Sequence, residues 1–339
     1  MKTAVITGAT GCIGRSLINV CISHGYEVLA IIHRSSARAE ELKNIEHCHV
    51  LPLDLDEYDK GIIRAEESET RDSLDVCDSL DVQNNLSGFE LFFHLAWIAP
   101  SGEGRNNTDI QTSNIQYTLA AVRLAHSLGC SVFIGAGSQA EYGRVSAPIA
   151  PDTPTFPENG YGIAKLCAGQ MTRILCNQLG MKHIWCRILS VYGPYDGEKT
   201  LISTAIRFML TGSDTEFTPC EQMWDYIYSD DAALAMLTCA QKGTSGNIYI
   251  IGSGEARPLK DYINIIAEIT DYRGTPGFGR RPYNDKQVMF LQADPSSLCG
   301  IGFKPSVNFR EGVRRTIMAF VMGSDPITKV LQNTGGNHN

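Results

Sequence analysis

Short apolar runs alternate with amphipathic segments through the first half of the chain. The runs at residues 2–7 and 26–32 consist largely of aliphatic residues, which indicates buried strands. Similar runs predict a weak strand at 50–53 and further strands at 91–95 and 131–134. Strands that alternate with helices are typical of βαβ units, so this pattern predicts a parallel sheet with helices on its faces.

Helical periodicity lies between and after these strands. Residues 110–128 place Ile115, Leu119 and Val122 at a spacing of four and three, which predicts an amphipathic helix. A helix is also expected over 14–24, directly after the first strand. Past residue 190 the alternation weakens, but a strand at 246–251 and a helix at 259–269 are still expected.

These elements predict an α/β fold, namely a Rossmann-type doubly wound parallel sheet with a smaller α+β C-terminal substrate lobe. The dinucleotide-binding domain is expected to comprise 1–188 plus about 229–253, and the substrate-binding lobe 189–228 and 254–322. Residues 323–339 are expected to form a polar tail. The stretch 54–81 holds eleven acidic and three basic residues, a composition typical of a solvated face or an inserted segment.

Composition narrows the classes of function. The chain has 339 residues, 43% of them hydrophobic and 19% charged, as in ordinary globular domains. Its net charge of −8 argues against nucleic-acid binding through a basic face. The apolar runs are too short to cross a bilayer and the N-terminus lacks a secretory signal, so we expect no membrane partner and a cytoplasmic location.

The cysteines and histidines do not point to a metal. The cysteines number eleven, and those in apolar surroundings, Cys167 among them, are interpreted as buried free thiols. The run His47-Cys48-His49 is not expected to converge on one ion, because successive residues of a strand point to opposite faces.

A glycine-rich turn follows the first expected strand. Residues 7–14 are Thr-Gly-Ala-Thr-Gly-Cys-Ile-Gly, which places Gly8, Gly11 and Gly14 between that strand and the helix after it. Glycine permits a tight turn, close approach of the backbone to a pyrophosphate, and close helix packing. The pyrophosphate would then meet the free N–H groups of the helix. We therefore expect a bound dinucleotide here, also contacted by Thr10, Cys12 and Ile13.

The end of the second strand bears on the choice of cofactor. In NAD-binding proteins an acidic residue about 20 positions after the glycines bonds the ribose 2′-OH. This chain instead has Ile32-His33-Arg34-Ser35-Ser36, without a carboxylate. Arg34, with His33 beside it, favours NADP(H) over NAD(H), because a guanidinium pairs with a 2′-phosphate. Asp54, just after the third strand, is placed to reach the adenine edge.

A tyrosine and a lysine open a helix in the second third of the chain. Tyr161 and Lys165 are four residues apart and therefore share a helical face. A free tyrosine has a pKa of about 10, and a nearby ammonium lowers this value by stabilising the phenolate. Ser138 follows a strand at the sheet edge where ligands bind, so its hydroxyl can bond a reacting oxygen. We predict that Tyr161 is the proton donor or acceptor of a hydride-transfer enzyme.

Several motifs occur in one order along the chain: Thr7-Gly8-x-x-Gly11-x-x-Gly14, Asp54-Leu55, His94-Leu95-Ala96, Asn114, Ser138 before Tyr142-Gly143, Tyr161-x-x-x-Lys165, and Val191-Tyr192-Gly193-Pro194. Over roughly residues 2–320 the chain thereby resembles the extended short-chain dehydrogenase/reductases, the NAD(P)-dependent epimerase/dehydratase group that works on nucleotide sugars. The resemblance implies a triad of Ser138, Tyr161 and Lys165, and further cofactor contacts at Leu55, Leu95 and Ala96. It also implies that Asn114 supports the lysine through water, and that a homodimer forms through two helices per subunit, including the one with Tyr161.

The C-terminal half looks most similar to the CDP-abequose and CDP-paratose synthases, which reduce a CDP-4-keto-6-deoxyhexose. The similarity rests on residues 193–198, 221–226 and 258–261. Trp224 replaces an arginine that usually contacts the substrate diphosphate, Ser190 replaces an asparagine, and Arg281 matches a second diphosphate arginine. The expected substrate contacts are Ser138, Gln139, Ser190, Trp224 and Arg281.

The resemblance implies an NADPH-dependent reductase of a nucleotide-linked 4-keto-6-deoxyhexose. An epimerase of the same group with tightly bound NAD is the alternative, and a catalytically silent NADP-binding sensor is a third interpretation. Dehydration is not expected: the dehydratases carry an Asp-Glu pair directly after the catalytic Ser or Thr, whereas this chain has Gln139 and Ala140.

Overall fold

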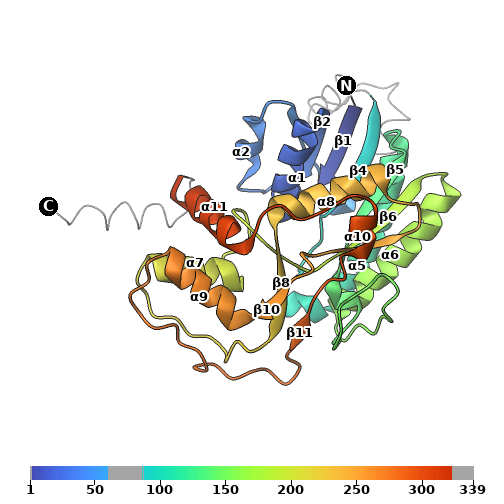
Figure 1. Ribbon diagram of the computed structural model, residues 1–339. Coiled ribbons are helices and arrows are strands. Elements are labelled where there is room, and N and C mark those ends of the chain that lie inside the picture. The colour runs from blue at the N-terminus through green and yellow to red at the C-terminus, as the bar shows by residue number, and fades with distance from the viewer. Residues whose placement is uncertain (1, 60–85, 87, 323–339) are drawn as a thin grey trace.

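The computed structural model describes residues 2–59, 86 and 88–322, and its larger sheet has seven strands. They pair in the order β3-β2-β1-β4-β5-β6-β9, and all pairs are parallel (Figure 1). The strands are β1 (Lys2–Thr7), β2 (Tyr26–Ile32), β3 (Cys48–Pro52), β4 (Phe89–His94), β5 (Val132–Ser138), β6 (Lys182–Ile188) and β9 (Ile248–Ile251). The strand order reverses between β1 and β4, at the switch point where such sheets bind ligands. The predicted doubly wound α/β fold is confirmed.

Helices cover both faces of this sheet (Figure 1). Ala4 and Ile6 of β1 pack in one cluster with α1 and α8, whereas Val5 packs in another with α5, because strand side chains alternate between faces. The long helices are α1 (Cys12–Ser23), α5 (Thr108–Ser127), α6 (Gly160–Gln178) and α8 (Ser229–Lys242). Shorter pieces are α2 (Ala39–Lys43), α10 (Ser296–Gly300) and the 3-10 turns η1 (Leu55–Glu57), η2 (Glu103–Asn106) and η3 (Gln139–Glu141).

A smaller lobe has its own sheet and its own core. Strand β8 (Met223–Tyr228) pairs with β7 (Ser190–Tyr192), β10 (Ala256–Pro258) and β11 (Phe290–Leu291). Three helices gather beside it, away from the large sheet (Figure 1): α7 (Leu201–Leu210), α9 (Leu259–Ile269) and α11 (Phe309–Met322). Their apolar faces share one cluster that includes Ile206, Ile263 and Val313, so the lobe is held by burial of these side chains.

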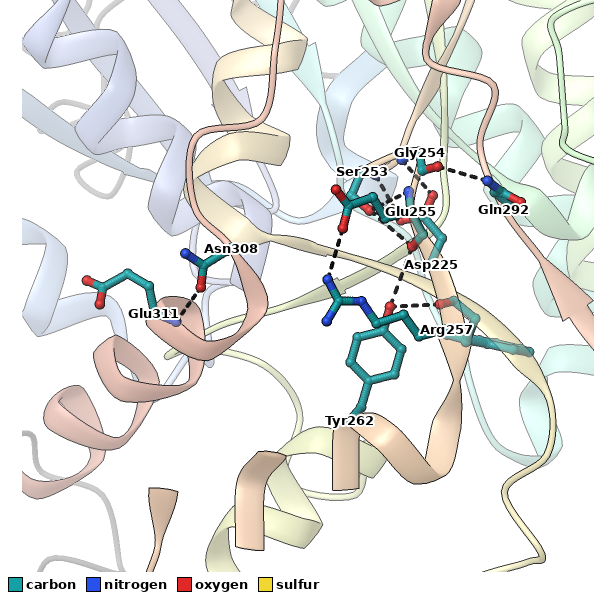
Figure 2. A network of polar contacts seen from close by, with 10 residues as sticks. Asp225, Ser253, Gly254, Glu255, Arg257, Tyr262, Gln292, Asn308 and Glu311 are labelled. Atoms are coloured by element: carbon teal, nitrogen blue, oxygen red, sulfur yellow. Dashed lines mark hydrogen bonds and ion pairs between the residues drawn. The ribbon is translucent and has the colours of Figure 1, made fainter. Parts of the chain in front are cut away.

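A buried carboxylate joins the lobe to the large sheet (Figure 2). Asp225 of β8 is 0% exposed and accepts hydrogen bonds from the backbone N–H and the hydroxyl of Ser253, at 2.8 and 2.6 Å. It also accepts from the amides of Gly254 and Ala293, at 2.9 and 3.0 Å. Because Ser253 and Gly254 follow β9, this single side chain ties the edge of the parallel sheet to the lobe.

Most elements lie close to their expected positions. The helix at 259–269 has the expected bounds, while β5 runs to Ser138 and β9 starts at Ile248. Cys167 on α6 is exposed, so its interpretation as a buried thiol was wrong. The expected tail at 323–339 and residues 60–81 of the acidic stretch lie outside the described residues. Within the described part of the chain, no helix is long and apolar enough to span a membrane.

Candidate active site

The glycine turn packs closely against the end of β4. Gly8 has a φ of +67°, and a Cβ there would lie 2.8 Å from the backbone nitrogen of Ala96. A Cβ on Gly14 would lie 2.3 Å from the carbonyl oxygen of Gly8. The Thr7 hydroxyl oxygen accepts the amides of Leu95 and Ala96, both at 3.2 Å. A side chain at Gly8 would therefore push the turn away from the end of β4, and one at Gly14 would push the start of α1 away from the turn.

The start of α1 fits the diphosphate of a dinucleotide. Gly11 is its N-cap and provides no capping side chain, and the first turn contains no acidic residue. The first N–H groups of such a helix lack helical partners and carry the positive end of its dipole, so they attract an anion. Thr10 precedes this helix start and Cys12 and Ile13 open the helix, and their contact with a cofactor stays a prediction.

Arg34 and Asp54 come together where β2 and β3 end. The Asp54 carboxylate accepts the backbone N–H of Arg34 at 2.9 Å and lies 3.6 Å from Nε2 of His33. The Arg34 guanidinium donates to both carboxylate oxygens of Glu57, at 3.0 and 3.1 Å. Arg34 therefore lies just after β2, as expected, but its charge is already paired with Glu57, which the sequence did not indicate.

A second arginine lies nearer the glycine turn. Nη1 of Arg38 donates to the carbonyl oxygens of Thr10 and Tyr195, both at 3.2 Å. Arg15 and Arg38 both lie over the Tyr195 ring, 5.2 and 5.9 Å from its centroid. Sequence reasoning missed Arg38, because only the fold brings it to the carbonyl oxygens of Thr10 and Tyr195.

Ser138, Tyr161 and Lys165 meet at the carboxyl end of β5. Ser138 ends that strand, while Tyr161 and Lys165 lie in the first turns of α6. Burial raises the pKa of Tyr161 above its ordinary value, and the neighbouring Ser138 side chain opposes this by lowering it. Lys165 is 4% exposed and its Nζ donates to the carbonyl oxygen of Ala136 at 2.7 Å. Burial lowers the pKa of Lys165 to about 7.

Arg105 and Trp97 flank the Tyr161 ring. Cζ of Arg105 lies 4.5 Å from the ring centroid, and the Trp97 ring meets it edge-on at 5.9 Å. Nζ of Lys165 is 5.8 Å from the Tyr161 centroid but 3.7 Å from that of Trp97. Arg105 is thus the nearer of the two cations, and its charge lowers the Tyr161 pKa. The sequence had suggested Lys165 for this effect and gave no signal for Arg105.

Asn114 on α5 fixes the segment that follows β4. Its Oδ1 accepts the Ile98 amide and its Nδ2 donates to the Ile98 carbonyl, each at 2.9 Å. One turn away, Gln111 accepts a hydrogen bond from Nε1 of Trp97 at 3.0 Å. Asn114 and Gln111 thereby hold Trp97 beside the triad. The implied water-mediated contact between Asn114 and Lys165 stays a prediction.

A buried carboxylate lies directly behind Ser138. Glu141 is 0% exposed, and its Oε1 accepts the backbone N–H of Ser138 at 2.8 Å. Its Oε2 accepts from Nε of Arg187 at 2.6 Å, and Nε1 of Trp185 donates to Oε1 at 3.0 Å. Both carboxylate oxygens are therefore engaged by groups of β5 and β6, which fixes the turn that presents Ser138.

The Trp185 indole fills a slot that three glycines leave open. A Cβ on Gly135 or Gly137 of β5 would lie 2.1 or 2.4 Å from an indole atom, and a Cβ on Gly169 of α6 would lie 2.6 Å from one. The indole therefore sets the spacing between the strand and the helix that carry the triad.

The expected substrate residues divide into two groups. Ser190 and Trp224 are brought together, because the indole Nε1 donates to the Ser190 hydroxyl at 2.8 Å. Gln139 directly follows Ser138 as the first residue of η3. Arg281 lies elsewhere in the lobe, where its 63% exposed side chain pairs with Glu216 at 3.3 Å. Ser190 and Trp224, the two residues that replace the usual asparagine and arginine of the family, thus contact each other.

The start of α1 lies uncapped at the switch point of the sheet, and Tyr161 and the buried Lys165 lie at the same edge. These features together define an NAD(P)-dependent enzyme of the short-chain dehydrogenase/reductase class. Residues 4–252 match the NAD dependent epimerase/dehydratase family, and the chain belongs to it. The sequence resemblance is thereby confirmed.

Known proteins of this family are similar to most of the chain. The dTDP-4-dehydro-6-deoxyglucose reductase of Escherichia coli is 26% identical over 236 residues, which are 66% of this chain and 72% of the relative. The CDP-abequose synthase of Salmonella muenchen is 22% identical, with 93% of this chain and 97% of the relative covered. The solved UDP-glucose 4-epimerase of Thermotoga maritima, with UDP-glucose, has a TM-score of 0.78 at 23% identity and covers 94% of this chain and 98% of its own. This last likeness shows the fold.

Proposed function

We propose that the protein reduces the 4-keto group of a nucleotide-linked 6-deoxyhexose with NADPH. The observation that carries this proposal is the placement of Tyr161, at the start of α6, beside Ser138 at the end of β5, next to a Gln139 and an Ala140 that cannot ionise. Such a site offers one proton and one hydrogen bond to a carbonyl oxygen, without the acid–base pair that dehydration needs. The similarity to dTDP-4-dehydro-6-deoxyglucose reductase supports the same reaction.

Each triad residue receives a separate task. The nicotinamide, when bound, supplies hydride to the carbonyl carbon. Tyr161 gives its phenolic proton to the carbonyl oxygen, and the Ser138 hydroxyl donates a hydrogen bond to that oxygen. Lys165, buried next to Ala136 and Trp97, is assigned to hold the ribose of the dinucleotide. In this scheme 1–188 with 229–253 bind the dinucleotide, and 189–228 with 254–322 bind the sugar nucleotide.

The phosphorylated cofactor is favoured by two arginines. Arg34 follows β2 at the place where a ribose 2′-phosphate is read in this fold, and Arg38 contacts the glycine turn itself. A phosphate would replace Glu57 as the partner of Arg34 and gain a charge-assisted bond. In the lobe, Trp224 is assigned to stack on the base or sugar, and Arg281 to bind the diphosphate.

The test is a turnover assay with purified protein. CDP-, UDP-, GDP- and dTDP-linked 4-keto-6-deoxyhexoses are each mixed with NADPH or NADH, and loss of the reduced nicotinamide is followed by absorbance. We expect turnover with one nucleotide series, faster with NADPH, and slowed roughly 100-fold or more by Tyr161→Phe. The Tyr117→Phe variant, altered on α5, is the matched control and should retain turnover. If no ketone is reduced, the reductase proposal is wrong.

One observation favours an epimerase with NAD instead. The carboxylate of Glu57 neutralises Arg34, and the adjacent Asp54 carboxylate can bond an unphosphorylated ribose. The two proposals differ in how the cofactor is held, because an epimerase regenerates it in every cycle. Denaturing the purified protein and identifying the released nucleotide separates them: bound NAD+ supports the epimerase, whereas an empty site that takes up NADPH supports the reductase.

We infer further that the protein forms a homodimer through α6. Ile163, Met171 and Ile174 lie on one side of this helix and are 55%, 45% and 51% exposed. Clustered exposed apolar side chains on a helix are typical of an interface. Sedimentation should show two subunits for the wild type and one for Ile174→Asp, whereas Met318→Asp on α11, which is 55% exposed, should stay dimeric. A monomeric wild type would contradict the inference.

A further inference from the structure

We propose that the Arg105 guanidinium, held over the aromatic face of Tyr161, stabilises the tyrosinate that remains when Tyr161 has given up its proton. Cζ of Arg105 lies 4.5 Å from the ring centroid, within the range of a cation–π contact. Loss of the phenolic proton turns this contact into an attraction between opposite charges. The inference rests on the proposed role of Tyr161 and adds a residue that acts through it.

Arg105 is anchored beside Tyr161 by both neighbouring helices. Its Nη1 donates to the carbonyl oxygen of Pro100 at 3.0 Å. The next residue, Asn106, accepts the amide of Gly160 at the start of α6 at 3.0 Å. Gln111 of α5 donates to the carbonyl oxygen of Gly104, the residue before Arg105, at 3.0 Å. The guanidinium is thus carried by a segment tied to the helix that bears Tyr161.

The other charged groups near Tyr161 cannot take over this role of Arg105. Glu141 of η3 is negative and raises the Tyr161 pKa, and burial raises it further. Lys165, on the same helix, places its Nζ 5.8 Å from the Tyr161 centroid. Burial lowers its own pKa to about 7, so Lys165 loses its charge more readily than an ordinary lysine as the pH rises. Burial lowers the pKa of Arg105, but from an ordinary value above about 12 and against the Tyr161 charge that raises it, so the guanidinium stays protonated near neutral pH.

The sign of the pH effect follows from these charges. A cation lowers the pKa of Tyr161, so its removal must raise that pKa and shift the ionisation of Tyr161 to higher pH. Because only the tyrosinate attracts the guanidinium as an opposite charge, the difference between the two protonation states corresponds to a shift of about one pH unit. A different role, in which Arg105 binds an anionic group of the substrate, would raise KM and leave the ionisation of Tyr161 unchanged.

The test titrates Tyr161 directly, without substrate or cofactor. The protein is labelled with ¹³C at the tyrosine ring carbon that bears the hydroxyl, and the Tyr161 resonance is identified by its absence in Tyr161→Phe. We expect its midpoint to rise by about one pH unit in Arg105→Gln and to stay near the wild-type value in Arg105→Lys, which keeps the charge. Arg123→Gln, which removes a charge from α5 at a distant ion pair with Asp59, is the matched control.

Each outcome decides the point. An equal midpoint in wild type and Arg105→Gln refutes the proposal. A raised KM with an unshifted titration assigns Arg105 to substrate binding. Because the titration needs no turnover, a failure of the reductase proposal leaves this result unaffected. In a working assay, the limb of the pH–rate profile that reports Tyr161 should move in the same direction as the resonance.

Discussion

Replacing Glu141 by glutamine should destabilise the protein far more than a matched change at its surface. Glu141 and Arg187 form an ion pair whose side chains are 0% and 3% exposed. Removing one charge leaves the Arg187 guanidinium buried without its counter-charge, a change that costs about 3–5 kcal/mol. The glutamine amide oxygen can replace one acceptor, but the N–H₂ group then faces the N–H donors of Arg187 or Trp185. Because a donor cannot bond a donor, we expect a loss in the upper half of this range of about 3–5 kcal/mol. In a chain of this length the loss lowers Tm by roughly 5–10 °C.

Thermal and urea unfolding of Glu141→Gln and Glu158→Gln provide the assay. Glu158 pairs with Arg144 in two parallel hydrogen bonds, but these side chains are 25% and 48% exposed, so this variant should unfold almost like the wild type. At a temperature where Glu141→Gln is fully folded, its turnover should still be reduced, because the Ser138 amide has lost a charged acceptor. Equal losses of stability in the two variants would show that the buried pair is not what holds this turn.

Four further outcomes are expected. Tyr161→Phe should lower turnover by roughly 100-fold or more while cofactor affinity, measured by fluorescence titration, survives. Arg34→Ala should weaken NADPH about tenfold or more and leave NADH nearly unchanged, since a charge-assisted contact is worth about 1.5–3 kcal/mol; equal effects on both cofactors would show that Arg34 does not read the phosphate. Arg281→Ala should raise the substrate KM with little change in cofactor affinity, and an effect on stability alone would make the residue structural. Incubation with nucleotide hexoses should give no 4-keto-6-deoxy product, because Gln139 cannot ionise and Glu141 is fully engaged behind Ser138; steady formation of that product would overturn this reasoning.

The fold could be predicted because its signals are local. Apolar runs of strand length and the helix at 259–269 depend on residues close together in sequence. The same holds for the glycine turn and for the pair Tyr161 and Lys165, since a spacing of four defines a helical face without tertiary information. Membership of the family followed from the order of such motifs.

The surroundings of these motifs could not be predicted, because they depend on contacts between distant segments. Glu57 reaches Arg34 across 23 positions, and Arg187 reaches Glu141 across 46. Arg105 lies in a turn without periodicity, and only the packing of α5 and α6 brings it over Tyr161. Local patterns therefore identified the reacting groups, whereas the charged groups beside them, such as Glu57 and Arg105, could be identified only from the structure.

The hydrogen bonds of Asp225 have a consequence for the construction of chimeric enzymes. The lobe is a natural unit to exchange between relatives of different specificity, but its boundary in three dimensions is not a boundary in the chain. Asp225 belongs to the lobe, Ser253 and Gly254 follow an edge strand of the parallel sheet, and Ala293 comes after β11. A graft that takes β8 from one parent and the segment after β9 from another places a buried carboxylate opposite backbone amides that did not evolve with it. Crossover points for such hybrids must therefore keep these three segments from the same parent.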